Sequence, residues 1–144
     1  MTLDFYHDAW EQDAPISPDN LDADARAVPY LHAKWWRFYT SERLAYKKLS
    51  IEFKLLYRQK WEWFTGKLHD DERNELGWPV QNLRVLSTNA QTYIDADPDI
   101  QTQQKRIALA EETLRFLEDV IKSINARNYS IKNAIDFLRF KMGN

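Results

Sequence analysis

Basic and aromatic side chains recur along the stretch from Tyr30 to Lys67, whose pattern predicts one long helix. A helix turns by about 100° per residue, so side chains three, four or seven positions apart share a face. One face carries a row that we call the basic–aromatic ridge: Trp36, Arg43, Lys47, Lys54, Arg58 and Trp61. Lysine and arginine neutralise phosphates, and tryptophan stacks on bases without sequence preference. The ridge is therefore typical of a surface that binds a polyanion.

Charge is strongly segregated along the chain, although the formal net charge is only −2. Residues 34–67 hold nine lysines and arginines against three acids, which gives this segment a charge of +6. Residues 1–24 hold seven acids and no lysine or arginine, and residues 68–144 hold ten bases against twelve acids. Only the long helix is basic, which favours an anionic partner. The alternative is that these charges form the solvated face of an amphipathic helix.

The sequence gives no indication of catalysis. His7, His32 and His69 lie in different predicted elements, without the spacing of metal ligands. Cysteine is absent, which removes thiolate chemistry, and neither a P-loop nor a nucleophile-elbow motif is present. We therefore expect no enzyme, no metal site and no cofactor.

Length and composition predict a single domain, because 144 residues are one domain's worth of chain. Aromatic residues make up 14% of the sequence, so burial or stacking must employ them. No apolar run approaches the roughly 20 residues of a membrane span, and the acidic N-terminus lacks the basic start of a signal peptide. We expect a soluble intracellular protein with no membrane partner.

The long helix also has an apolar face opposite the ridge, formed by Leu31, Phe38, Ala45, Leu49, Leu56 and Trp63. At about 1.5 Å per residue the helix would span roughly 55 Å, which exceeds a compact domain of this length. Part of it must therefore project or pack on another chain, which predicts a homo-oligomer. Gly66 suits a C-terminal cap. Pro29 should kink or break the chain after a first short helix from about Asp19 to Ala27.

The C-terminal half also reads as helical. Residues 68–79 form a polar connector, and a short helix is plausible at residues 88–96. Asp97 should cap a helix that runs from Pro98 to about Asn125. Apolar residues recur in that helix at the a and d positions of four heptads, which indicates a coiled-coil or bundle seam. A last helix capped by Ser130 follows, so the fold class is all-α with a C-terminal coiled-coil-like helix pair.

The segment from Lys54 to Lys67, KLLYRQKWEWFTGK, resembles the basic-aromatic helix end of the UvsY family, the recombination mediators of T-even-type bacteriophages. Two cations lie two residues apart in that family, and here they are Arg58 and Lys60. An acidic and aromatic turn follows them, and the segment ends in a small residue, a glycine and a basic residue. The run from Ile124 to Gly143 is similar to the family's ending, so the resemblance covers roughly residues 16–144.

This resemblance implies a mostly helical protein that forms a ring-like homo-oligomer in the cytoplasm of the host cell. It would bind single-stranded DNA and help a UvsX-like recombinase displace the single-strand-binding protein. The acidic composition of residues 1–20, which match little of the family, predicts an acidic N-terminal arm, and residues 21–144 would be a single helical oligomerising and DNA-binding domain. The arm either docks on a basic partner or folds back on the chain's own basic helix.

The candidate DNA contacts combine the ridge with the family's cation pair. The helical period places Lys60 far around the helix from the other cations, so geometry favours Lys54 and Arg58 while the resemblance favours Arg58 and Lys60. The full set of candidates is Arg43, Lys47, Lys54, Arg58, Lys60, Trp61 and Lys67. The alternative function is a non-catalytic helical assembly or adaptor protein whose basic face docks an acidic partner.

Overall fold

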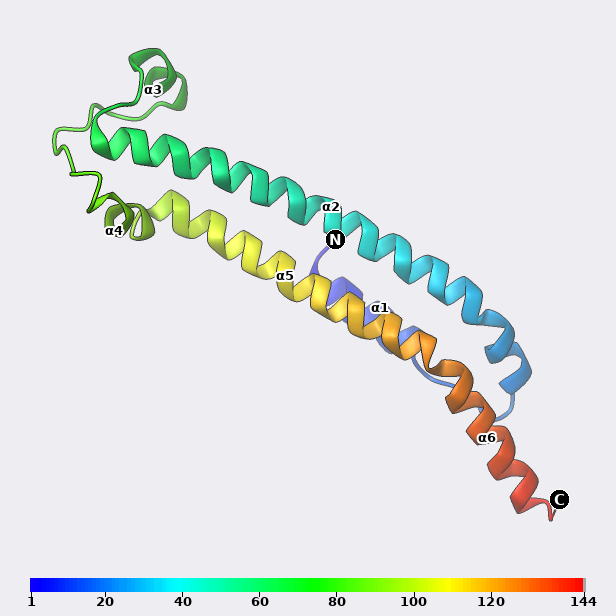
Figure 1. Cartoon of the computed structure of the whole chain (residues 1–144). Helices are drawn as coiled ribbons and strands as arrows, with labels where there is room; N and C mark the ends of the chain where they lie inside the picture. Colours follow the sequence, from blue (N-terminus) through cyan, green and yellow to red (C-terminus); the bar gives the residue numbers. More distant parts are fainter. Residues whose placement is uncertain (144) are drawn as a thin grey trace. The chain divides into compact units, whose positions relative to one another are not determined.

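The computed structural model describes residues 1–143, and in that part of the chain it contains helices and no strands. The expected all-α class is therefore confirmed. The six helices are α1 (Leu3–Asp13), α2 (Leu21–Thr65), α3 (Asp70–Leu76), α4 (Ala90–Asp95), α5 (Pro98–Asn125) and α6 (Arg127–Lys141) (Figure 1). None of the described helices is long and apolar enough to cross a membrane.

The chain forms two compact units. Unit 1 contains Met1–Leu44 and the chain from Glu111 onward, and unit 2 contains Ala45–Ala110. Both α2 and α5 contribute one part to each unit. The prediction that residues 21–144 form a single oligomerising and DNA-binding domain stays a prediction, and each unit is described by itself below.

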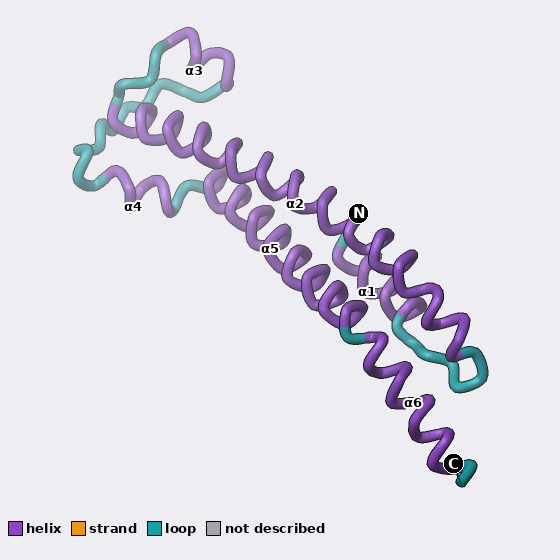
Figure 2. Tube along the Cα trace, turned by 45° about the vertical axis from the view of Figure 1, so that its right-hand side comes forward, coloured by secondary structure: helices purple, strands orange, loops and turns teal. Residues whose placement is uncertain are grey.

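The core of unit 1 joins α1 to the first part of α2 and the second part of α5, which lie alongside one another (Figure 2). Its buried residues are Tyr6, Leu31, Trp35, Leu117, Val120, Ile121 and Ile124. Each comes from the apolar face of its helix, because that face can leave water only by packing on another helix.

The N-terminal segment, for which the sequence predicts an acidic arm, contains the 11-residue helix α1. Thr2 caps α1 by accepting a hydrogen bond from the Phe5 N–H (3.2 Å). At the other end the Asp13 carboxylate accepts from Lys34 Nζ (2.7 Å) and from Trp35 Nε1 (3.0 Å). The segment therefore folds back on the chain's own α2, which was one of the two alternatives for this segment.

Pro29 lies inside α2, so of the predicted kink or break, the break is wrong. A proline within a helix removes one hydrogen bond and crowds the carbonyl four residues earlier, at a cost of about 3 kcal/mol. The Pro29 side chain is exposed, while Leu31 and Trp35 on the next turns are buried in the core of unit 1. We infer that this burial offsets the lost hydrogen bond and keeps the helix continuous.

Unit 2 packs the second part of α2 against α4 and the start of α5. Ala90, Ile94 and Ile100 are fully buried there, and the aromatic residues of α2 pack against them. The Gln103 side chain donates to the Leu49 carbonyl (3.1 Å). The predicted caps at Gly66 and Asp97 are confirmed, since Gly66 follows the last residue of α2 with φ of 76° and the Asp97 carboxylate accepts from the Asp99 and Ile100 N–H groups.

The predicted polar connector at residues 68–79 contains α3, which the sequence pattern missed. This helix begins with three acids, Asp70, Asp71 and Glu72. Their carboxylates interact favourably with the positive end of the helix dipole. Gly77 ends it in the left-handed conformation, with φ of 71°. These are ordinary start and stop signals for a helix, but the segment is too short to show an apolar period.

The heptad stripe of α5 packs within the chain, since Ile100 and Gln103 are buried in unit 2 and Leu117 and Ile124 in unit 1. The helix is interrupted only at Ala126, which keeps right-handed dihedral angles, and α6 begins at Arg127 without a side-chain cap. The expected Ser130 cap is therefore wrong. So is the expected C-terminal helix pair, because α6 continues beyond the end of α5 and does not turn back beside it (Figures 1 and 2).

Candidate nucleic-acid interface

Three cations of the basic–aromatic ridge are exposed and unpaired. Lys47 and Lys54 belong to unit 2, and Arg43 belongs to the part of α2 in unit 1. Among the described residues their side chains form no ion pair and no hydrogen bond. Their full charge is therefore available to an anion from solution, which makes them the simplest candidate phosphate contacts.

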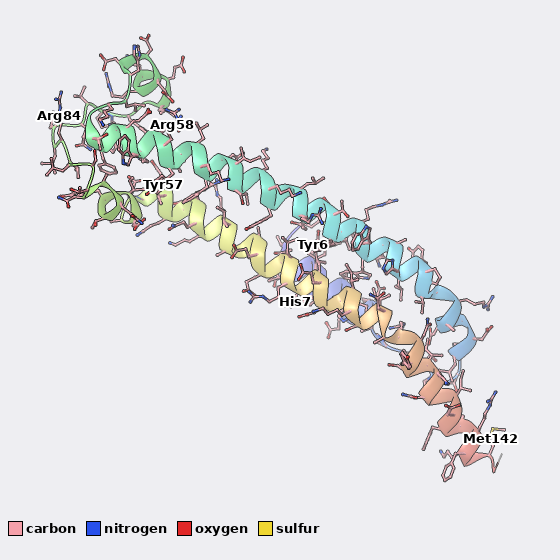
Figure 3. The ribbon with its side chains drawn as sticks, viewed as in Figure 1. Tyr6, His7, Tyr57, Arg58, Arg84 and Met142 are labelled. Carbon is pink, nitrogen blue, oxygen red and sulfur yellow. The ribbon has the colours of Figure 1, made fainter. Side chains whose placement is uncertain are left out.

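Arg58 is exposed but already paired. Its guanidinium donates to the carboxylates of Glu72 (2.8 Å) and Glu62 (2.7 Å) (Figure 3 labels Arg58). The hydrogen bond to Glu72, and then that to Glu62, raises the pKa of Arg58. The same contact, with a second hydrogen bond from Gln59, lowers the pKa of the Glu72 carboxyl. The two carboxylates use two of the five guanidinium donors and offset its charge, so a phosphate binds Arg58 at full strength only when they move away.

Lys60, which the family resemblance makes a candidate DNA contact, is buried in this structure. It is 3% exposed, and its ammonium lies 3.2 Å from the Asp97 carboxylate and 2.9 Å from that of Asp99. The rings of Trp78 and Trp63 cover it, with centroids 4.1 and 4.8 Å from Nζ. We call these five residues the Lys60 cluster.

The physical reason for this burial is the helical period itself, which places Lys60 on the side of α2 that faces the core of unit 2. A lysine there can remain charged only if anions and aromatic faces replace its water, which the Lys60 cluster supplies. The cluster also joins separate segments, because Asp97 caps α5 and Trp63 Nε1 donates to the Pro79 carbonyl (2.8 Å). Lys60 thus holds unit 2 together at the end of α2.

Trp61 and Lys67 form a pair at the end of α2. The Lys67 ammonium lies 4.8 Å from the centroid of the Trp61 ring, and Lys67 is exposed. Trp61 is half-buried because it packs against the core cluster of unit 2. Only part of its ring is therefore accessible to a base. Trp36, in unit 1, is 48% exposed and lies parallel to the His32 ring, 6.1 Å away.

Sequence reasoning missed two residues that bear on this surface. Glu72 comes from the segment predicted to be a connector, and its contact with Arg58 joins positions 14 residues apart. Arg84 is exposed and lies beyond the end of α2 (Figure 3). Neither the Glu72 contact nor the position of Arg84 beside the end of α2 follows a helical period, so no sequence signal could have found them. In the described part of the chain no group of acids and histidines could hold a metal ion.

Comparisons with known proteins agree on one family. Residues 9–144 match the family described as "Recombination, repair and ssDNA binding protein UvsY". The fold also matches crystal structures of the bacteriophage T4 recombination mediator protein UvsY. Its lattice type IV structure has a TM-score of 0.85 and 18% identity and covers 97% of this chain and 99% of that one. The lattice type II structure has a TM-score of 0.84 and 19% identity and covers 99% of this chain and 98% of that one.

At these identities the solved structures establish the fold alone, and no curated protein sequence matches the chain. The family match extends over nearly the whole chain, from α1 to the C-terminus. It covers the second part of α2, which contributes Lys47, Lys54 and Arg58. The chain is therefore a member of the UvsY family of recombination and repair proteins.

Proposed function

We propose that this protein is a recombination mediator that binds single-stranded DNA. It helps to load a UvsX-like recombinase onto DNA covered by single-strand-binding protein, and it does so as a ring-like homo-oligomer. The observation that carries the proposal is the row of exposed, unpaired cations on α2 in a chain whose family is described as binding single-stranded DNA.

The order of the proposed DNA contacts depends on whether each cation is already paired with a carboxylate of the chain. Arg43, Lys47 and Lys54 bind phosphates first, because no carboxylate has to leave them. Arg58 binds after Glu72 and Glu62 give way. Trp61 and Lys67 contribute at the end of the helix, where a base stacks on the accessible part of the Trp61 ring. Lys60 has no comparable access and supports the surface from within.

Assembly requires a surface other than the heptad stripe of α5, which is used within the chain. Unit 1 leaves Phe137 and Phe140 of α6 exposed, at 61% and 80%, together with Met142 directly after it, at 75%. Exposed apolar groups of this size mark contacts with other proteins. We propose that α6 contributes to the subunit contacts. Analytical ultracentrifugation tests the assembly, and a single species of 17.2 kDa at micromolar concentration would contradict it.

The DNA-binding proposal is tested by fluorescence anisotropy of labelled oligo-dT in a salt series. For single strands the logarithm of affinity falls with a slope of about −0.7 per neutralised phosphate. Replacing Lys47 and Lys54 together by Met should flatten the slope by about 1.4 for each subunit in contact, because two phosphates lose their partners. Lys105→Met with Arg106→Met is the matched control, since both are exposed cations of α5 in the same unit.

Two outcomes would argue against parts of this proposal. An unchanged slope in the Lys47 and Lys54 variant, with the oligomer intact, would remove these lysines from the site. Absence of oligo-dT binding by the unchanged protein at low salt would refute DNA binding itself. The adaptor function, in which the same basic face docks an acidic protein, would then take its place.

A further inference from the structure

A small hollow in unit 2 lies beside the C-terminal end of α2. Its volume is about 130 Å³, which compares with the roughly 30 Å³ that one water occupies in the liquid. Two guanidinium groups, Arg73 and Arg84, line it together with the Trp63 ring, the Gln81 amide and a single carboxylate, Asp70. Cations therefore outnumber anions around a space that could admit a small anionic group.

The backbone fixes Arg84 at this place. The next residue, Val85, is 9% exposed, and its N–H donates to the Phe64 carbonyl in the last turn of α2 (2.9 Å). The Arg84 side chain then lies directly on Gly66, where an added Cβ would come within 3.0 Å of Arg84 Nε. The glycine thus serves both its own left-handed turn, with φ of 76°, and the close approach of Arg84.

The two arginines differ in how their donors are used. Arg73 donates to the Trp78 carbonyl (3.0 Å) and lies 3.7 Å from Asp70, so it is held in position by its own unit. Arg84 forms no hydrogen bond and no ion pair with the residues that the structure describes, although a guanidinium has five donors. The carboxylate of Asp70 is 85% exposed in its side chain and does not neutralise Arg84.

We propose that this hollow binds a backbone phosphate of single-stranded DNA, with Arg84 as its principal contact. A guanidinium presents paired donors that match two phosphate oxygens, and the position of Arg84 is set before the ligand arrives. Arg73 also lines the hollow and adds positive charge, and Trp63 lines it as well. The site lies off the basic–aromatic ridge, so it extends the proposed DNA contacts beyond α2. This inference rests on the DNA-binding function proposed above.

The test compares Arg84→Met with the unchanged protein in the oligo-dT salt series. Methionine keeps an unbranched stem on Gly66 and removes the charge and the donors. Loss of one phosphate contact per engaged subunit should flatten the slope by about 0.7. Between 50 and 200 mM salt, the loss of affinity should then be about 2.6-fold smaller for each such contact. Arg106→Met, an exposed arginine of α5 in the same unit, should leave the slope unchanged.

A second variant separates charge from geometry. Arg84→Lys keeps the charge, so it should restore most of the slope while binding more weakly than arginine, because an ammonium cannot bind two oxygens in parallel. Circular dichroism and the oligomeric mass should stay unchanged in each variant. Unchanged affinity and slope in Arg84→Met would overturn the inference.

A further measurement tests whether the hollow binds a DNA phosphate or free phosphate. It compares thermal unfolding in sodium phosphate with unfolding in sodium chloride at equal ionic strength. Phosphate stabilises folded proteins in general by its exclusion from their surface, so we expect equal extra protection of the unchanged protein and of Arg84→Met. Greater protection of the unchanged protein than of Arg84→Met, with equal DNA slopes, would assign the hollow to free phosphate and refute the DNA assignment. Failure of the Lys47 and Lys54 variant to change binding would count against the ridge, whereas failure of Arg84→Met alone would count only against this hollow.

Discussion

Replacing Lys60 by Met should destabilise the protein without removing a DNA contact. The substitution deletes the only cation of the Lys60 cluster and leaves the buried carboxylate of Asp97 unpaired. Breaking a buried ion pair from one side costs about 3–5 kcal/mol. The Asp97 carboxylate still accepts hydrogen bonds from the backbone N–H groups of Asp99 and Ile100, which limits the cost. The Asp99 side chain is 59% exposed, so the loss of its ion pair with Lys60 contributes little.

These contacts place the expected loss at the lower end of that range, about 3 kcal/mol. For chains of about this length each kcal/mol lowers the melting temperature by about 2–4 °C, which gives roughly 6–12 °C. The assay is thermal and urea unfolding followed by circular dichroism, at one fixed protein concentration because assembly adds stability. Lys54→Met is the matched control, and as an exposed, unpaired lysine it should change stability by less than about 0.5 kcal/mol.

In the DNA assay the effects of the two lysine substitutions should be the reverse of their effects on stability. Lys54→Met should flatten the salt slope for oligo-dT by about 0.7 per engaged subunit. Lys60→Met, measured at a temperature where it is folded, should leave that slope unchanged. A Lys60→Met protein as stable as the unchanged one, with a flatter slope, would refute the reasoning. It would mean that Lys60 contacts phosphate in solution, as the resemblance of its motif first implied.

Two further predictions concern acids that hold a partner in place. Glu72→Gln should tighten oligo-dT binding at low salt and steepen its slope by up to about 0.7, because Arg58 then loses one of its two internal anions. Tyr6→Phe should cost about 1 kcal/mol in urea unfolding, since Tyr6 donates to Glu42 (2.7 Å). Burial, and then this hydrogen bond, raises the pKa of Tyr6, so its stabilising contribution is complete below the ordinary tyrosine pKa of about 10 and is lost above it. The stability difference between the two proteins should therefore shrink as pH rises beyond 10.

Local signals in the sequence were sufficient for most of the helical framework. The C-terminal end of α2 follows from Gly66, and the start of α5 follows from the Asp97 cap with Pro98. The long apolar period of each helix predicts how far it extends. These features act within one turn of the backbone, so they can be read without knowing what packs against them. The same holds for the exposure of Lys47 and Lys54, which the helical period places away from the apolar face.

The errors have a common cause, which is contact between residues far apart in the sequence. Pro29 remains helical because Leu31 and Trp35 on the following turns are buried among residues of α1 and α5. The N-terminal segment is ordered because Asp13 reaches Lys34 and Trp35. A motif cannot show such contacts, and this is also why the family's cation pair separates here into one paired surface arginine and one buried lysine.

The tryptophans explain why charge, more than stacking, should dominate DNA binding in this chain. Trp35 is fully buried, and Trp10 packs against it edge to face (5.6 Å). Trp63 and Trp78 cover the Lys60 ammonium. Each unit is built from few helices, so large rings close the sides of its core, and that packing covers part of each ring. Trp36 is exposed, and Trp10, Trp61, Trp63 and Trp78 are half-buried, so only part of each of these four rings is open to a base, whereas several cations stay free. Strong dependence on salt, with little change in tryptophan fluorescence, is the binding behaviour that this distribution predicts.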